Sequence, residues 1–163
     1  MDMKLIPTPR LAAALLSGLL TSLSGCVDEG VYVIPESQAA ELIREVLEER
    51  GVDAVATTER IGGLSVCVEG SPCRTLDLAL DGWDEEARVG FAYISDADRG
   101  LPSSTRVEMA EAEAIQEQLD ERRDELGLVV VFREWAHETE SLAVDQLRRA
   151  VASALDGRGL TAL

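Results

Sequence analysis

Histidine, lysine and cysteine, which often carry out covalent or metal chemistry, are scarce in this sequence. His137 is the only histidine, and the stretch from His137 to Ser141 begins like the HExxH motif of zinc proteases. Ser141 stands where the second histidine would have to be, so a zinc-protease site is not predicted. No G-x-S-x-G turn is present to supply a nucleophilic serine beside the histidine. We therefore expect His137 to be a polar residue in the first turn of the last helix.

The acidic segment that starts at Asp96 has the composition of a calcium-binding loop only at its beginning. Its fifth, sixth and twelfth positions are Gly100, Leu101 and Val107, where an EF-hand needs an oxygen ligand, a glycine and a glutamate. We expect a turn between a strand and a helix there, with weak incidental calcium binding as the alternative. Lysine chemistry is also excluded, because Lys4 is the last lysine and a Schiff base or a P-loop needs one. The sequence predicts no cofactor and no metal site.

The start of the chain has the layout of a secretory leader. Lys4 and Arg10 precede a mostly apolar run over residues 11–23. This run is shorter than the roughly 20 residues that a membrane-spanning helix needs, so a permanent membrane helix is not expected. The run ends in Leu23-Ser24-Gly25-Cys26.

Leu-Ser-Gly-Cys resembles the lipobox of bacterial lipoproteins, in which the cysteine carries the lipid and becomes the mature N-terminus. The resemblance covers only Met1 to Cys26. It implies a signal peptide over residues 1–25, a lipid on Cys26 that anchors the chain to the bilayer, and a place in the cell envelope. Val27, not aspartate, follows the cysteine, which favours the outer membrane if the cell has one. The alternative is an ordinary secretory signal that happens to contain a cysteine.

The lipoprotein resemblance leaves Cys67 and Cys73 as an even pair in an oxidising compartment. Their spacing is C-x5-C instead of the C-x-x-C of thiol oxidoreductases, which favours a structural disulfide. If the two cysteines face each other across a hairpin, the apolar side chains fall on one face and the sulfurs on the more polar face. The neighbouring pairs are then Ser65 with Thr75 and Leu64 with Leu76.

The composition is strongly acidic. The chain has 31 acidic and 15 basic residues and a formal net charge of −16. Such a surface repels nucleic acid and anionic lipid headgroups and favours cationic partners, so we expect no nucleic-acid partner.

Hydrophobic periodicity gives the expected elements and boundaries. Residues 26–34 are a short tether, and residues 35–163 form one α+β domain of ordinary size. The expected elements are helices over 35–50, 105–126 and 138–155, a weak strand over 52–59, and strands near 64–69, 75–81, 89–94 and 128–132. The last helix is expected to bury Leu142, Leu147, Val151 and Leu155.

This order, α-β-β-β-β-α-β-α, predicts a two-layer α+β fold with a mostly antiparallel sheet of about five strands and three helices. A meander is followed by one β-α-β crossover. The strand at 128–132 is the most apolar, as expected of a strand covered on both faces. Its position stays open: either a helix covers it at the sheet edge, or the first two strands separate to admit it.

The two tryptophans are the candidates for partner binding. Trp83 and Trp135 each follow a predicted strand. If the strands at 75–81 and 128–132 are parallel, Trp83, Trp135 and His137 gather at one edge. Asp84 and Glu85 lie beside them, which gives an aromatic surface rimmed by carboxylates. That surface would suit a cationic or carbohydrate partner. If the strands are antiparallel, the tryptophans lie at opposite edges.

No catalytic motif accompanies these features. The expected function is a membrane-anchored acidic lipoprotein that acts as a binding or adaptor module, with an unknown protein or envelope ligand as its partner. Two other classes remain open. One is a carboxylate-based hydrolase of the envelope, with or without a metal ion; the other is an inhibitor or immunity-type protein that masks a cationic partner.

Overall fold

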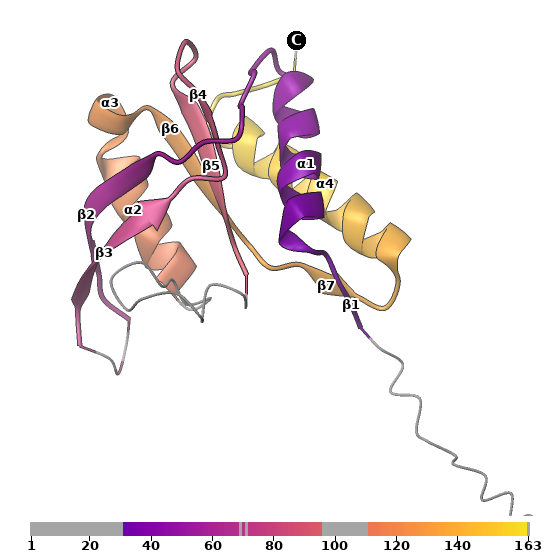
Figure 1. Ribbon diagram of the computed structural model, residues 1–163, viewed down its shortest axis with the longest axis horizontal. Helices are drawn as coiled ribbons and strands as arrows, with labels where there is room; N and C mark the ends of the chain where they lie inside the picture. Colours follow the sequence, from indigo (N-terminus) through magenta and orange to yellow (C-terminus); the bar gives the residue numbers. More distant parts are fainter. Residues whose placement is uncertain (1–30, 69, 71, 96–110, 163) are drawn as a thin grey trace, which may run out of the picture.

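The computed structural model describes residues 31–68, 70, 72–95 and 111–162 (Figure 1). The predicted leader, the lipid on Cys26, most of the tether, the Asp96–Gly100 turn and the predicted helix start at Thr105 lie outside these residues. The elements are β1 (Tyr32–Val33), α1 (Glu36–Glu48), β2 (Arg60–Val66), β3 (Arg74–Ala79), β4 (Gly82–Asp84), β5 (Val89–Ile94), α2 (Ala112–Glu121), α3 (Arg123–Leu126), β6 (Leu128–Arg133), β7 (Ala136–His137) and α4 (Glu140–Asp156).

The fold is α+β, as predicted, but the described strands form three sheets instead of one sheet of about five strands. Their orders are β1-β7, β2-β3 and β4-β5-β6. The split occurs where the Leu80 N–H donates to Glu59 O, beside β2, while the Asp81 N–H donates to Phe91 O of β5. The chain thus passes from pairing with β2 to pairing with β5 between β3 and β4.

The three-stranded sheet lies at the centre and is covered on both faces (Figure 1). Phe91 and Val130 pack with α1 and α4 on one face, whereas Ala92 and Val129 pack with α2 and the β2-β3 hairpin on the other. All residues of β5 are buried, which explains why its side chains are apolar on both faces of the sheet. The domain therefore has three layers instead of the predicted two.

The position of the 128–132 strand is settled by its pairing. β6 runs parallel to β5, with Phe91 opposite Val130, and it is the last strand of its sheet. This confirms the β-α-β crossover through α2. Helix α2 contacts β6, and its Gln116 bonds part of the outer edge of the strand, so a helix covers part of the sheet edge, as in the first of the two alternatives.

The first and last helices follow the predicted periodicity. α1 begins after Pro35, and Gly51 beyond its end has φ of +73°, a left-handed conformation that glycine adopts without strain. α4 is capped by the Thr139 side chain, which accepts from the Leu142 N–H at 3.4 Å. Its buried stripe repeats every fourth residue and consists of Ala143, Leu147, Val151 and Leu155.

Three predictions in these elements were wrong. Leu142 is 41% exposed, because the stripe through Ala143 turns it out of the core. His137 lies in β7 instead of the last helix, since the Thr139 cap makes that helix begin at Glu140. The segment 52–59 forms no strand and makes only one isolated antiparallel bridge, from Val55 to Trp83.

The β2-β3 hairpin has the predicted register. Ser65 pairs with Thr75 and Leu64 with Leu76, and both leucines are buried. Nearer the start of β2, Gly62 and Gly63 form a bulge opposite Asp77, whose Oδ1 accepts from the Gly63 N–H at 3.2 Å. Gly63 has φ of +72°, so the bulge requires the left-handed conformation that glycine allows.

Candidate functional site

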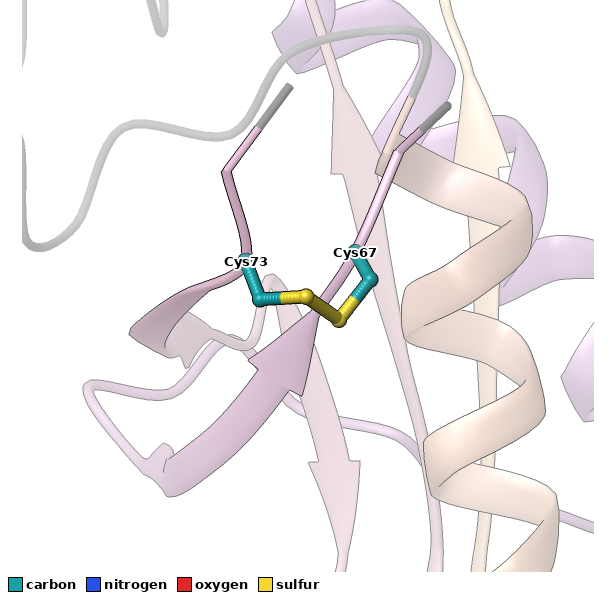
Figure 2. The surroundings of a disulfide bond; sticks show 2 residues. All are labelled: Cys67 and Cys73. Atoms are coloured by element: carbon teal, nitrogen blue, oxygen red, sulfur yellow. A yellow bond between two sulfur atoms is a disulfide. The ribbon is translucent and has the colours of Figure 1, made fainter. Parts of the chain in front are cut away.

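The predicted disulfide is present and closes the β2-β3 hairpin. Cys67 and Cys73 are joined by an S–S bond of 2.07 Å, with their Cα atoms 4.2 Å apart (Figure 2). Both residues are exposed, on the face that carries Ser65 and Thr75. Figure 2 shows that the bond joins the segment that follows β2 to the segment that precedes β3. The bond is a structural crosslink at the turn end of the hairpin, where it closes the loop between β2 and β3.

Trp83 packs into the sheet and borders a hollow. Its indole lies against Gly90, where a Cβ atom would come within 2.6 Å of Trp83 Cε3. The hollow beside it has a volume of about 560 Å³. Charges of both signs meet in it, so it has no single preference for an ion. Its lining is Glu59, Arg60, Ile61, Leu80, Trp83, Glu85, Arg88, Glu125 and Leu126.

Asp84 holds the turn that follows Trp83. Its Oδ1 accepts from the Ala87 N–H at 2.9 Å, and its Oδ2 accepts from the Asp53 N–H at 2.7 Å. These backbone donors, with Ala87 first, lower the pKa of the Asp84 carboxyl below its ordinary value. The carboxylate therefore stabilises the turn and is not available as an open ligand.

The structure does not bring the two tryptophans together. Trp83 is level with Gly90 on β5, and β4 runs antiparallel to β5. Trp135 follows β6, whose Arg133 is level with Ile94 at the far end of β5. The steps from Gly90 to Ile94 alone place the two tryptophans roughly 13 Å apart along the sheet. The predicted shared aromatic surface, which required parallel strands, is not formed.

Trp135 and His137 lie together at the other end of the sheet, where β7 pairs with β1. The Trp135 N–H donates to the Tyr93 hydroxyl at 2.9 Å, and its carbonyl accepts from the Ile34 N–H at 3.0 Å. His137 is paired with Tyr32, and its Nδ1 accepts from the Glu138 N–H at 2.9 Å. This leaves the ring proton of a neutral His137 on Nε2.

A short chain of polar contacts borders His137. The Tyr32 hydroxyl donates to Gln38 Oε1 at 2.7 Å, and Gln38 Nε2 donates to Glu140 Oε1 at 3.3 Å. Partial desolvation and then the negative charge of Glu140 raise the pKa of Tyr32. The phenol therefore stays protonated at neutral pH and acts as a hydrogen-bond donor, tying β1 to the first turns of α1 and α4.

A mainly apolar groove runs along the outer edge of β6, between α2 and α4. It has a volume of about 260 Å³. Strand β6 and Trp135 form its floor, and small side chains of α4 form one wall. The lining is Ala112, Glu113, Gln116, Val130, Val131, Phe132, Arg133, Trp135, Leu147, Ala150, Ala154 and Arg158.

Gln116 of α2 occupies one end of this groove and bonds the free edge of the strand. Its Nε2 donates to the Val129 carbonyl at 3.0 Å, and its Oε1 accepts from the Val131 N–H at 2.8 Å. The side-chain amide thus makes the two bonds that a neighbouring strand would make. Sequence reasoning missed this residue, although a signal exists: Gln116 falls in the helical spacing of Ile115 and Leu119, where an apolar residue is expected.

An acidic hollow of about 570 Å³ adjoins the groove and shares Glu113 and Gln116 with it. Its remaining lining is Glu117, Asp120 and Glu121. Asp120 is paired with Arg158 at 3.2 Å. Among the described residues, no three histidine, cysteine or carboxylate side chains are grouped so that they could hold a metal ion.

Large apolar side chains are exposed at a few positions only. Val31 is 58% exposed and Val33 is 43% exposed, and both belong to the chain around β1. Leu142, in the first turn of α4, is the third, and α4 contacts both β1 and β7. The fourth among the described residues is Val55, beside Trp83. No helix in the described ranges is long and apolar enough to cross a bilayer.

Comparison with known proteins adds no relative to this description. No family model, no curated protein and no solved structure matches the chain. The case for a function therefore rests on the residues and geometry given above.

Proposed function

We propose that this protein is an envelope lipoprotein, anchored to a membrane by a lipid on Cys26, that acts there by binding a partner. The structural observation that carries the proposal is the apolar end of the domain. Val31, Val33 and Leu142 are exposed at the end where the described chain begins. Apolar side chains of this size, exposed near one another, are typical of surfaces that face a membrane or a partner.

The anchor and the apolar end are close in sequence. Cys26 precedes Val31 by only five residues. Fully extended, such a segment spans at most about 18 Å. A lipid on Cys26 therefore keeps this end of the domain at the bilayer surface.

The charges near this end limit the kind of contact. Glu36, Glu138 and Glu140 lie in or next to the first turns of α1 and α4. Carboxylates are repelled by anionic headgroups, so the lipid and the apolar side chains, and not electrostatic attraction, supply the affinity for the membrane.

The disulfide agrees with this compartment. Disulfides persist in oxidising compartments such as the bacterial periplasm and the cell surface, and are rare in the cytosol. The exposed Cys67–Cys73 bond would be open to reducing agents in the cytosol, because both residues lie at the surface. The hydrolase and inhibitor classes stay predictions, since no particular observation favours them over binding.

Mass spectrometry of the intact protein from the membrane fraction tests the anchor. We expect residues 1–25 to be absent and Cys26 to carry more than one acyl chain, because a single chain gives only marginal membrane binding. Cys26→Ser should move the protein into the soluble fraction. The double variant Cys67→Ser/Cys73→Ser is the matched control, because it removes the other cysteines and should keep the lipid. An unmodified Cys26 in the wild-type protein would overturn the proposal.

A further inference from the structure

The outer edge of β6 is only partly used. The N–H groups of Leu128 and Glu134 donate toward β5, to the carbonyls of Arg88 and Ile94, at 2.9 and 2.7 Å. Even-numbered residues of this strand therefore bond β5. Because the backbone alternates with a period of two, the odd-numbered residues turn their N–H and C=O groups to the outer edge.

Gln116 bonds the first pair of groups on that edge, and the next pair lies further along the groove. This second pair is the Val131 carbonyl and the Arg133 N–H. The α2 residues that line the groove besides Gln116 are Ala112 and Glu113. Alanine has no polar side chain, and a carboxylate cannot donate to a carbonyl. In the described part of the chain, α2 therefore has no side chain in the groove that could both donate to the Val131 carbonyl and accept from the Arg133 N–H, as Gln116 does for the Val129 carbonyl and the Val131 N–H.

We infer that this groove is a site of strand addition: an extended segment of a partner protein pairs with the outer edge of β6, beyond Gln116. Main-chain hydrogen bonds supply affinity in this mode of recognition, and side chains at alternate positions supply specificity. The inference deepens the proposed binding function and rests on it, but it does not depend on the lipid at Cys26.

The walls of the groove specify the side chains of the added segment. Residues of an added strand point alternately to the two faces of the sheet. One face meets Ala150 and Ala154 of α4, where small walls leave room for apolar side chains. The other face meets Glu113 of α2, which is exposed and is shared with the adjoining acidic hollow. The segment should therefore alternate apolar and basic residues.

Charge also distinguishes a foreign segment from a second copy of this chain. Each copy carries a net charge of −16, so two copies repel each other, whereas a basic segment is attracted. Two arginines also line the groove: Arg133, which is exposed at the end of β6, and Arg158, which is paired with Asp120. The basic residues of the partner are therefore expected beside Glu113, on the α2 side of the groove, and not beside the two arginines.

A capped octapeptide of alternating lysine and valine, labelled with a fluorophore, is a direct probe of this site. Fluorescence anisotropy with the full lipidated chain in detergent micelles should show saturable binding, weakened about tenfold or more when glutamate replaces lysine in the peptide. In the protein, Ala150→Trp fills the groove and should weaken binding about tenfold, while Ser153→Trp on the exposed side of the same helix should not.

Backbone methylation separates strand addition from simple charge attraction. In an added strand, the amides of either the lysines or the valines face β6, depending on the strand direction. N-methylation of one set should abolish binding, and N-methylation of the other set should leave it unchanged. Equal effects of the two sets, no binding at millimolar peptide, or a chain that dimerises through this edge would each overturn the inference. An unlipidated Cys26, by contrast, would overturn the anchor and leave this result unaffected.

Discussion

Gln116 gives the sharpest test of how β6 is stabilised, because its amide both donates and accepts. Gln116→Leu removes the bonds to the Val129 carbonyl and the Val131 N–H and leaves both groups partly buried. A neutral hydrogen bond contributes about 1 kcal/mol, so we expect the free energy of unfolding to fall by about 2 kcal/mol.

Gln116→Glu keeps the shape of the side chain and makes its effect depend on pH. The ionised carboxylate still accepts from the Val131 N–H, but it cannot donate to the Val129 carbonyl. The protonated carboxyl can do both, so the folded state raises the pKa of the new group above its unfolded value of about 4.3. Its stabilising contribution is then fully present below that value and is lost as the pH rises through the folded pKa. We expect a cost of about 2 kcal/mol at neutral pH and less than about 1 kcal/mol near pH 4.

Urea unfolding of the full chain at the two pH values measures this difference, always relative to the wild-type protein at the same pH. Gln118→Glu is the matched control on the same helix. The side chain of Gln118 donates to the Glu121 carboxylate at 3.1 Å on the exposed surface, so its replacement should cost about 0.5 kcal/mol or less. Equal costs of Gln116→Glu at both pH values, or a cost no larger than that of the control, would refute the proposed role of Gln116.

Three further outcomes are expected from unfolding experiments. Cys67→Ser/Cys73→Ser opens a short loop and should lower the free energy of unfolding by about 2 kcal/mol, an effect that reductant should reproduce in the wild type. Gly90→Ala places a methyl group against Trp83, so it should cost about 1–3 kcal/mol and shift the tryptophan emission; an unchanged spectrum would contradict the packing. Asp84→Asn should cost about 1 kcal/mol at neutral pH. Since the folded pKa of Asp84 is lowered, that difference should disappear as the pH falls through it.

The sequence alone predicts a structural feature correctly where a residue pattern is compatible with only one packing or one strand register. The repeat of apolar residues in α1 predicts its buried face, and the two cysteines determine the hairpin register, because a shift by one residue would turn Leu64 and Leu76 to solvent. The parallel crossover to β6 was also predictable from its continuous apolar run.

Other features depend on contacts that no local pattern encodes. β1 and β7 have two residues each, too few for a period of two to be recognised. The break between β3 and β4 depends on which segments accept the N–H groups of Leu80 and Asp81, and tertiary contacts determine those partners. The separation of Trp83 from Trp135 follows from that same choice, since it sets the direction of β4 against β6. The buried face of α4 includes Ala143 and not Leu142, and this too depends on the elements against which α4 packs.

The outer edge of β6 could pair with other chains, and α2 covers part of it. A valine-rich strand with a free edge is a template for pairing with other chains, and proteins usually cover or charge such edges. Here α2 covers the edge over Val129 and Val131 through Gln116, and it lines the adjoining surface with Glu113 and Glu117. Full coverage would need only one more polar side chain in place of Ala112. Partial coverage with negative charge instead disfavours pairing with an acidic chain, including a second copy, while it leaves the edge open to a basic one. An edge that was only to be protected from aggregation would not need an apolar groove beside it, and this difference is the reason to test the groove for strand binding.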